Sequence, residues 1–200
     1  MTTVPIILAS TSTSRRMMLE AAGLVFTVVA PNVDEELMRD LLTGNGADTY
    51  TIAHALAEAK AVAVSEKHPG ALTIGADQLL VCEERILSKA IDADDARRTL
   101  QALSGRRHEL ISAAVIAKDG QPIWQRTETA LLQMCELSET FLDAYLTAEI
   151  PEVLGSVGCY RIEGRGVQLF REISGDHFCI RGLPLLAIIG ALRDFGALPQ

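Results

Sequence analysis

The sequence predicts an α/β protein with a mixed β-sheet, on three observations. Short apolar runs typical of strands alternate along the whole chain with segments of helical periodicity. Two long strand-like segments, His108–Ala117 and Thr127–Cys135, flank a turn at Lys118-Asp-Gly120, which predicts an antiparallel pair. Neither an internal repeat nor a low-complexity linker interrupts the pattern, so residues 1–200 are expected to form a single domain, built as one body or as two tightly joined lobes.

In the first half of the chain, turn residues separate the expected elements. Gly23 suits a helix C-cap, Pro31 closes a strand, and Pro69-Gly70 ends an Ala-rich helix. A loop is expected at Thr43-Gly-Asn-Gly46, and Gly75-Ala-Asp77 separates two short strands. The expected elements are strand Val4–Ala9, helix Arg15–Ala22, strand Val25–Val29, helix Thr49–His68, and strands Leu72–Ile74 and Leu79–Val81.

In the second half, three residues suited to helix starts are the strongest signals. Asp92 is a favourable N-cap, Ser138 suits a second N-cap, and Pro184 suits the first position of a third helix. Besides the two long strands, the expected elements are strand Arg85–Leu87, a helix from Asp92 to Leu103, a helix from Ser138 to Leu146, strand Val167–Ile173 and a last helix to Phe195.

Composition narrows the class of function. The net charge is −8, which argues against a general nucleic-acid surface, and 48% of the residues are apolar, enough for a sizeable core. No apolar run is long enough to span a membrane, and the first one lacks the basic flank of an export signal. The four cysteines show no zinc or redox spacing and are interpreted as reduced, buried thiols. A cytoplasmic protein with no membrane and no nucleic-acid partner is expected.

The first group of candidate functional residues follows the first strand. The segment Ser10-Thr-Ser-Thr-Ser14 enters a helix, and free backbone N–H groups at a helix start attract phosphate. Ser10 and Ser12 can donate further hydrogen bonds, and Arg15 and Arg16 supply positive charge. A capped surface helix with two solvated arginines is the alternative interpretation.

The second group is acidic and basic. A lone carboxylate between apolar strands, as at Asp77, is costly unless it is paired, hydrogen-bonded or holds a metal; a turn-forming aspartate is the alternative. Glu35 lies in an acidic run that could equally be a solvated turn. Lys60, on the long helix, and Lys89, after a strand-like stretch, would each be read alone as surface lysines.

Together these residues are similar in order and spacing to the motifs of the Maf family of nucleotide pyrophosphatases. The matching segments cover nearly the whole chain: Leu8-Ala-Ser-Thr-Ser with Arg15-Arg16, Pro31-Asn-Val-Asp-Glu35, Ala57-Glu-Ala-Lys-Ala61, Ile74-Gly-Ala-Asp77, Ile86-Leu-Ser-Lys89, Leu103-Ser-Gly105 with His108, Ile162-Glu-Gly164 with Gly166, and Gly182-Leu-Pro-Leu185. No single motif carries the resemblance; the ordered set does.

The resemblance implies an elongated, two-lobed mixed sheet with flanking helices around a central nucleotide cleft, related to the ITPase fold. It implies hydrolysis of a nucleoside triphosphate to a monophosphate and pyrophosphate with a divalent cation, Mg²⁺ or Mn²⁺. The purpose implied is nucleotide house-cleaning, with a homodimer left open as the assembly. By resemblance, the catalytic acid is Asp77, the conserved acid is Glu35, and the phosphate ligands are Ser10, Arg15, Arg16, Lys60 and Lys89. Ser12 is added to the phosphate ligands for its hydroxyl, and Asp77 and Glu35 are expected to take part in catalysis and to hold the metal.

Three further positions are implied to select the base, namely Ser14, Gln78 and Glu163. The branch of the family that cleaves 7-methyl-GTP carries Trp, Gln and Glu there, so this chain agrees with it at Gln78 and Glu163 and departs from it at Ser14. A second departure is Thr13, where the family usually has Pro, and a third is Ala90, again in place of Pro. The preferred base is therefore left open by the sequence.

Two other functions remain as alternatives. One is a nucleotide-binding regulator of septum formation and cell division with little catalysis, against which the retained acids Glu35 and Asp77 argue. The other is a related enzyme acting on deaminated purines such as ITP. For the hydrolase itself, the sequence does not decide whether Asp77 is a general base or a metal ligand.

Overall fold

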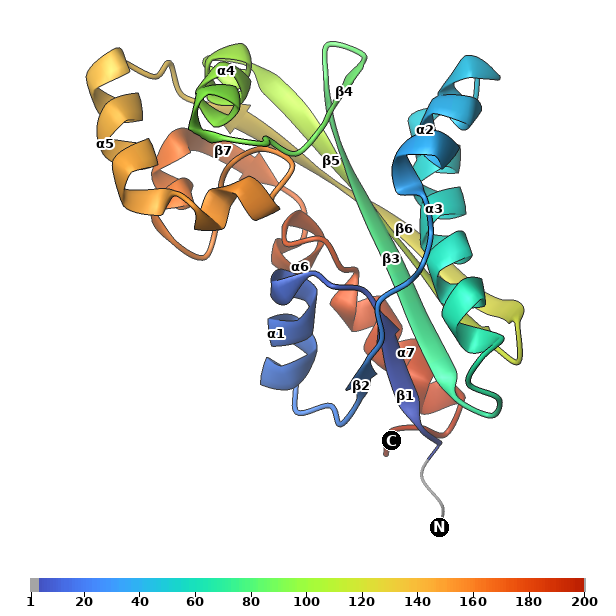
Figure 1. The fold of residues 1–200 in the computed structure, drawn as a ribbon. Coiled ribbons are helices and arrows are strands. Elements are labelled where there is room, and N and C mark those ends of the chain that lie inside the picture. The colour runs from blue at the N-terminus through green and yellow to red at the C-terminus, as the bar shows by residue number, and fades with distance from the viewer. Residues whose placement is uncertain (1–3, 200) are drawn as a thin grey trace. The chain divides into compact units, whose positions relative to one another are not determined.

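The computed structural model describes residues 4–199 (Figure 1). Its seven-stranded sheet has the strand order β2-β1-β3-β5-β6-β7, with β4 paired to β3, and contains both parallel and antiparallel neighbours. The predicted α/β class with a mixed sheet is therefore confirmed. The strands are β1 (Ile6–Ala9), β2 (Thr27–Val28), β3 (Leu72–Cys82), β4 (Arg85–Leu87), β5 (Arg107–Lys118), β6 (Gln121–Met134) and β7 (Phe170–Ser174).

The helices are α1 (Thr13–Ala21), α2 (Glu35–Gly44), α3 (Thr49–Ser65), α4 (Ala93–Leu103), α5 (Glu139–Glu149), α6 (His177–Ile180) and α7 (Leu185–Asp194), with short 3₁₀ turns at Glu152–Gly155 and Arg165–Leu169. Local capping explains several starts. The side chains of Asp92 and Ser138 accept hydrogen bonds from the N–H groups of Asp95 and Phe141, which confirms both predicted N-caps. Pro184 is the N-cap of α7 rather than its first residue.

The chain divides into two compact units. The first unit is made of the residues up to Gln78, Ser112–Glu128 and those from Gly182 onward; the second is made of Leu79–Ile111 and Thr129–Arg181. Strands β3, β5 and β6 contribute residues to both units.

The first unit is built on parallel strands. Strand β1 pairs with β2 on one side and with β3 on the other, and the register places Ala9 opposite Gly75. Helix α3 lies along β3 (Figure 1), and its Val64 packs against Ile7, Ala9 and Ala71. Because parallel strands end at the same edge, the residues after Ala9 and those after Gly75 meet there.

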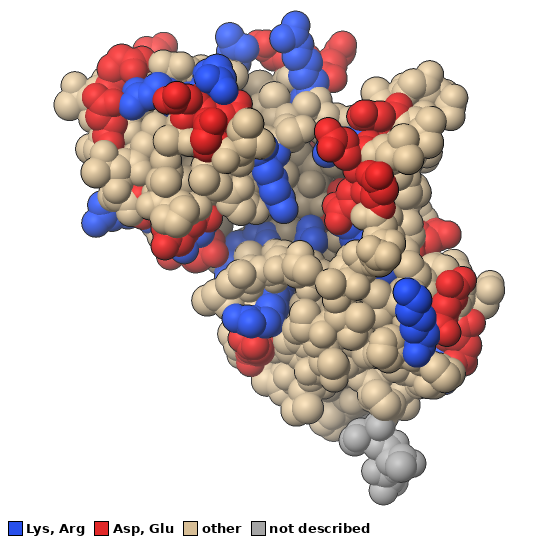
Figure 2. All heavy atoms as spheres, viewed as in Figure 1, with Lys and Arg blue, Asp and Glu red and all other residues tan. Residues whose placement is uncertain are grey.

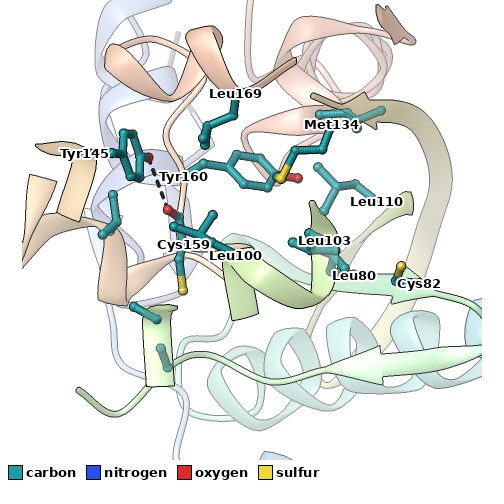
Figure 3. Packing of buried hydrophobic residues seen from close by; sticks show 14 of the residues in the cluster. Leu80, Cys82, Leu100, Leu103, Leu110, Met134, Tyr145, Cys159, Tyr160 and Leu169 are labelled. Carbon is teal, nitrogen blue, oxygen red and sulfur yellow. Dashed lines mark hydrogen bonds between the residues drawn. The ribbon is translucent and has the colours of Figure 1, made fainter. Parts of the chain in front are cut away.

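The second unit has its own apolar core, seen from close by in Figure 3. Leucines of β3, α4 and β5 pack with Tyr145 of α5 and with Tyr160, which follows α5 in the chain; the leucines are Leu80, Leu100, Leu103 and Leu110. Within this core, the Tyr145 hydroxyl donates a 3.1 Å hydrogen bond to the carbonyl of Cys159. The four cysteines form no disulfide, as the sequence predicts, and three of them are buried, but Cys135 is only partly buried. Burial raises the pKa of Cys159 to about 11.

Three expectations about local structure are wrong. The sequence predicts a strand over Val167–Ile173, but residues up to Leu169 form a 3₁₀ turn and β7 begins at Phe170. The sequence predicts a break between two strands at Gly75-Ala-Asp77, but β3 runs without interruption from Leu72 to Cys82. The small residues that suggest a break are instead required by the close approach of α3. Helix α2 is also absent from the sequence prediction; Asp34 is its N-cap, and its side chain accepts from the N–H of Leu37. No helix in residues 4–199 is long and apolar enough to cross a membrane.

Candidate active site

The turn after β1 forms a small polar hollow at the start of α1. Ser12 is the N-cap, and its side chain accepts from the backbone N–H of Arg15, while its own N–H donates to Ser10 Oγ at 3.2 Å. A cavity of about 60 Å³ is lined by Ser10, Thr11, Ser12, Thr13, Arg16 and Val28. Hydroxyl-bearing side chains and one arginine thus line a hollow at a helix start, and such groups can bind a phosphate.

Arg15 does not point into solvent; it is buried and bonded to the protein. Its Nε donates to the Gly182 carbonyl at 2.8 Å, and its Nη1 donates to the Ala76 carbonyl at 2.9 Å and to Ser10 Oγ at 3.3 Å. A guanidinium has five N–H groups, so two remain on Nη2 for another acceptor. Burial lowers the pKa of Arg15, and the charges of Asp77 and Glu35 oppose that shift. Arg15 therefore connects three segments: the turn after β1 through Ser10, strand β3 through the Ala76 carbonyl, and the segment before α7 through the Gly182 carbonyl.

Arg16 has a different environment from its neighbour. It is exposed, pairs loosely with Glu20 at 3.5 Å within α1, and lines the hollow. Consecutive helix residues point in different directions, which explains why only one of the two arginines is buried. The two predicted phosphate ligands thus differ in kind, since Arg15 supports the turn and Arg16 is accessible.

Lys60 joins the two predicted catalytic acids. Its Nζ lies 2.7 Å from Asp77 Oδ1 and 2.7 Å from Glu35 Oε2, and 3.5 Å from the Ala76 carbonyl. The Lys60 side chain is only 4% exposed and that of Asp77 10%, whereas Glu35 is 48% exposed. The structure therefore brings together three of the residues singled out in the sequence, on α3, β3 and the first turn of α2.

The folding of α3 onto β3 places these groups. Ala57 and Ala61 let the α3 backbone lie against Gly75, where an added Cβ would come within 2.3 Å of the Ala57 carbonyl oxygen. Side chains two residues apart on a strand share a face, so Asp77 points to the same side as Gly75, toward Lys60. Figure 2 shows acidic side chains gathered at the start of α2, where Asp34 caps the helix and Glu35 begins it.

The two carboxylates fit a divalent cation only in part. Among residues 4–199, no group of three or more His, Cys, Asp or Glu side chains could hold a metal ion. Mg²⁺, however, is commonly held by one or two carboxylates, with water and substrate phosphates completing its shell. Asp77 and Glu35, which converge on one cationic group, are the chemically appropriate donors for such a shared site.

The positions predicted to select the base lie in both units. In the first unit, Gln78 Nε2 donates to Ser112 Oγ at 2.9 Å, and Ser14 is partly buried in α1. In the second unit, Glu163 pairs with Arg181 at 3.5 Å. Lys89 also belongs to the second unit and is exposed after β4.

The loop that carries Glu163 is held on both sides of that residue. Arg161 Nη2 donates to the buried Glu149 at 3.1 Å, and Arg165 lies 3.9 Å from the same carboxylate. The Cα of Gly166 approaches the Arg161 backbone so closely that a Cβ would lie 2.5 Å from the Arg161 carbonyl oxygen. The alternate residues 161, 163 and 165 are each held by an ion pair, which restricts where Glu163 can point.

Sequence reasoning missed several partners of the site. The carbonyls of Ala76 and Gly182 and the hydroxyl of Ser112 make the hydrogen bonds described above, and Arg181 pairs with Glu163. Every residue has a backbone carbonyl, so the sequence does not show which carbonyls accept a side-chain hydrogen bond. Only the motifs that contain Ala76 and Gly182 indicated that those segments belong to the site. Ser112, inside a predicted strand, offered no signal.

Comparison with known proteins shows the family of this chain. The profile of the Maf-like protein family matches residues 5–195. The chain belongs to the Maf-like family. A nucleoside triphosphate pyrophosphatase of Paramagnetospirillum magneticum is 48% identical over 191 residues, covering 96% of this chain and 98% of that protein. A second nucleoside triphosphate pyrophosphatase, from Caulobacter vibrioides, is 46% identical over 99% of both chains. A 7-methyl-GTP pyrophosphatase of Mesorhizobium japonicum is 45% identical over 98% of both chains.

Proposed function

We propose that this Maf-like chain is a hydrolase that cleaves nucleoside triphosphates between the α- and β-phosphates, releasing a nucleoside monophosphate and pyrophosphate. The observation that carries the proposal is the buried Lys60 ammonium held between Glu35 and Asp77 in the middle of β3, where the adjacent Ala76 carbonyl also accepts from Arg15. Relatives of almost full length are named as nucleoside triphosphate pyrophosphatases, which supports hydrolysis over a purely regulatory role.

The proposed division of labour follows from charge. A triphosphate carries roughly four negative charges near neutral pH, so its phosphates need cations and N–H donors. In the first unit these are the hollow of Ser10 and Ser12 with Arg16, and the remaining N–H groups of Arg15. Lys60 and Lys89 complete the proposed set and offset charge that develops on the leaving pyrophosphate.

The carboxylates are proposed to act on the attacking water. Asp77 or Glu35 would orient the water toward the α-phosphorus and accept its proton, which requires a carboxylate within hydrogen-bond reach of that water. A divalent cation, Mg²⁺ or Mn²⁺, held by the same two carboxylates and phosphate oxygens, would supply charge neutralisation and acidify water. Asp77 is nearly buried and fixed by Lys60, which favours it over the half-exposed Glu35 as the residue on which turnover depends.

For the base, we propose a guanine type, with 7-methyl-GTP as the leading candidate. An ionised carboxylate accepts hydrogen bonds and donates none, and the N1–H and N2 amine of guanine offer two adjacent donors. Glu163 is suited to this role because its carboxylate pairs with Arg181, while the loop on either side of it is held by Arg161 and Arg165 against Glu149. One relative with the matching printed name is the 7-methyl-GTP pyrophosphatase of Mesorhizobium japonicum.

The proposed activity has a cellular location and two competing functions. Nucleotide house-cleaning would place the protein in the cytoplasm, where nucleoside triphosphates are made and used. A role in cell division and an enzyme for deaminated purines such as ITP are the competing functions; a substrate panel separates all three.

The decisive experiment is pyrophosphate release from a panel of triphosphates with Mg²⁺ and with Mn²⁺. We expect release of pyrophosphate and monophosphate, with no diphosphate intermediate, and a preference for 7-methyl-GTP or GTP over UTP, dTTP and ITP. Tight nucleotide binding without turnover would support the regulator instead. Accumulation of a diphosphate and free phosphate would show cleavage at the γ-phosphate and overturn the proposal.

A further inference from the structure

The ammonium group of Lys60 is saturated by protein oxygens. A lysine ammonium has three N–H donors and no acceptor. In the structure it faces three oxygens: Asp77 Oδ1 and Glu35 Oε2, each at 2.7 Å, and the Ala76 carbonyl at 3.5 Å. Lys60 therefore has no donor left for a phosphate unless it breaks one of these contacts.

The two carboxylates that Lys60 contacts are also the donors proposed above for a divalent cation. Two negative charges drawn toward one point, one on the nearly buried Asp77 and one on the half-exposed Glu35, form a site for positive charge, and the ammonium fills it. A divalent cation bound to both carboxylates would lie close to Lys60, and like charges at short distance repel each other.

We propose that Lys60 is a built-in counter-ion that occupies the place of the divalent cation in the nucleotide-free protein. The ammonium keeps Asp77 and Glu35 close together and offsets one of their two negative charges, and it competes with free metal ions for both carboxylates. When a metal–triphosphate complex arrives, its phosphates offer Lys60 new acceptors, so the ammonium moves to a phosphate oxygen and gives up the two carboxylates. This inference rests on the proposed function, because it assumes that the metal reaches the site together with the triphosphate.

The first test measures metal binding without nucleotide and without turnover. Mn²⁺ binding to the nucleotide-free protein is followed by electron paramagnetic resonance for wild type, Lys60→Met and Lys60→Arg. We expect Lys60→Met to bind Mn²⁺ at least about tenfold more tightly than wild type, because it frees both carboxylates, while Lys60→Arg stays as weak as wild type because it keeps the charge. Adding Glu35→Gln to Lys60→Met should return Mn²⁺ affinity to the wild-type value.

The matched control is Lys67→Met. Lys67 is an exposed lysine just beyond α3, so this variant changes the net charge equally without touching the carboxylates. Its Mn²⁺ affinity should equal that of wild type. If wild type already binds Mn²⁺ as tightly as Lys60→Met, or if Lys67→Met gains as much affinity, the counter-ion proposal is wrong.

A second readout uses only wild-type protein, in case Lys60→Met fails to fold. The ¹⁵N signal of the Lys60 ammonium is followed by NMR during addition of Mg²⁺ alone, and then of Mg²⁺ with a guanosine triphosphate whose α–β bridging oxygen is replaced by methylene. We expect no change with Mg²⁺ alone and a clear shift with the analogue. A shift with Mg²⁺ alone, or none with either, overturns the proposal. Neither experiment depends on hydrolysis, so a protein that releases no pyrophosphate would refute the proposed activity while leaving this inference testable.

Discussion

Gly75 on β3 packs against the backbone of Ala57 and Ala61 on α3. A Cβ on Gly75 would be 2.3 Å from the Ala57 carbonyl oxygen and 2.5 Å from the Ala61 backbone nitrogen. This contact sets the distance between α3 and β3. Lys60, next to Ala61, and Asp77, two residues along the strand, meet at 2.7 Å because the two backbones touch here. A glycine that resembles a strand break thus positions the site.

Gly75→Ala should therefore be strongly destabilising. The new methyl group meets backbone atoms on the helix, which cannot turn aside as a side chain could, and we expect a loss of at least about 3 kcal/mol in the free energy of unfolding. Urea denaturation measures it. The control is Gly190→Ala in α7, where an added Cβ meets nothing within 4 Å, so this variant should gain up to about 1 kcal/mol. Equal effects of the two substitutions would contradict the proposed role of Gly75.

Asp77→Asn should remove most activity while the fold is kept. The amide is nearly the same size, but it cannot accept a proton as a base, binds a divalent cation poorly and no longer balances the charge of Lys60. We expect pyrophosphate release to fall by about 10²-fold or more. Circular dichroism checks the fold. Turnover at the wild-type rate would remove Asp77 from the catalytic machinery.

Arg15→Ala and Arg16→Ala should separate stability from binding. Removing the Arg15 side chain takes away the side-chain donor to the Gly182 carbonyl and the nearer of two donors to the Ala76 carbonyl, so we expect a loss of about 3 kcal/mol together with activity. Arg16 makes only an exposed pair with Glu20, so its removal should change stability by less than about 0.5 kcal/mol. Because Arg16 lines the hollow, its removal should raise KM. Thermal melts and steady-state kinetics on both variants test this; a stable Arg15→Ala protein would contradict the first half.

His108 should make stability depend on pH. The imidazole is buried in the second unit, where Nε2 lies 2.8 Å from the Tyr160 hydroxyl, and burial lowers the pKa of His108 from 6.5 to about 4. As the pH falls, His108 is therefore protonated near pH 6.5 in the unfolded chain but only near pH 4 in the native state. The stabilisation is complete above pH 6.5 and is lost as the pH falls toward 4, by about 3 kcal/mol in all.

The measurement is the free energy of unfolding at several pH values for wild type and His108→Gln. Carboxylates that titrate in the same range contribute to both proteins, so the difference between the two isolates His108. We expect the destabilisation caused by His108→Gln to shrink as the pH falls from 7 to 4. A constant difference would mean that His108 carries no such pH dependence.

Glu163→Gln should change the ranking of substrates. The amide replaces one acceptor by a donor, which suits guanine less and leaves Arg181 without its counter-charge. We expect kcat/KM for 7-methyl-GTP and GTP to fall by about tenfold or more relative to UTP and dTTP. Glu172→Gln on β7, an exposed residue paired with Arg107, is the matched control. An unchanged ranking in Glu163→Gln would show that Glu163 does not read the base.

The sequence by itself determined the helices and strands that follow from local periodicity and capping residues, and the candidate site residues that follow from ordered motifs. Asp92 and Ser138 predict the starts of α4 and α5 because an N-cap interaction spans only three residues. The hairpin of β5 and β6 is predicted by two apolar runs on either side of Asp119-Gly120. The residues of the site were found the same way, as chemically distinctive side chains in a familiar order. Helix α2 was not predicted because none of its residues is buried, so little of its pattern distinguishes it from a solvated turn.

Only the tertiary structure decided how those residues relate to one another. The residues around Arg15 do not predict that its side chain is buried against the Gly182 carbonyl, 167 positions away, while the adjacent Arg16 is exposed. Nor does the sequence tell that β3 continues through Asp77, because the small residues before it could serve a turn or a helix contact equally well. These outcomes depend on which backbones approach and which donors meet which carbonyls. Such contacts join segments far apart in the chain, and their energies do not exist until both segments are in place.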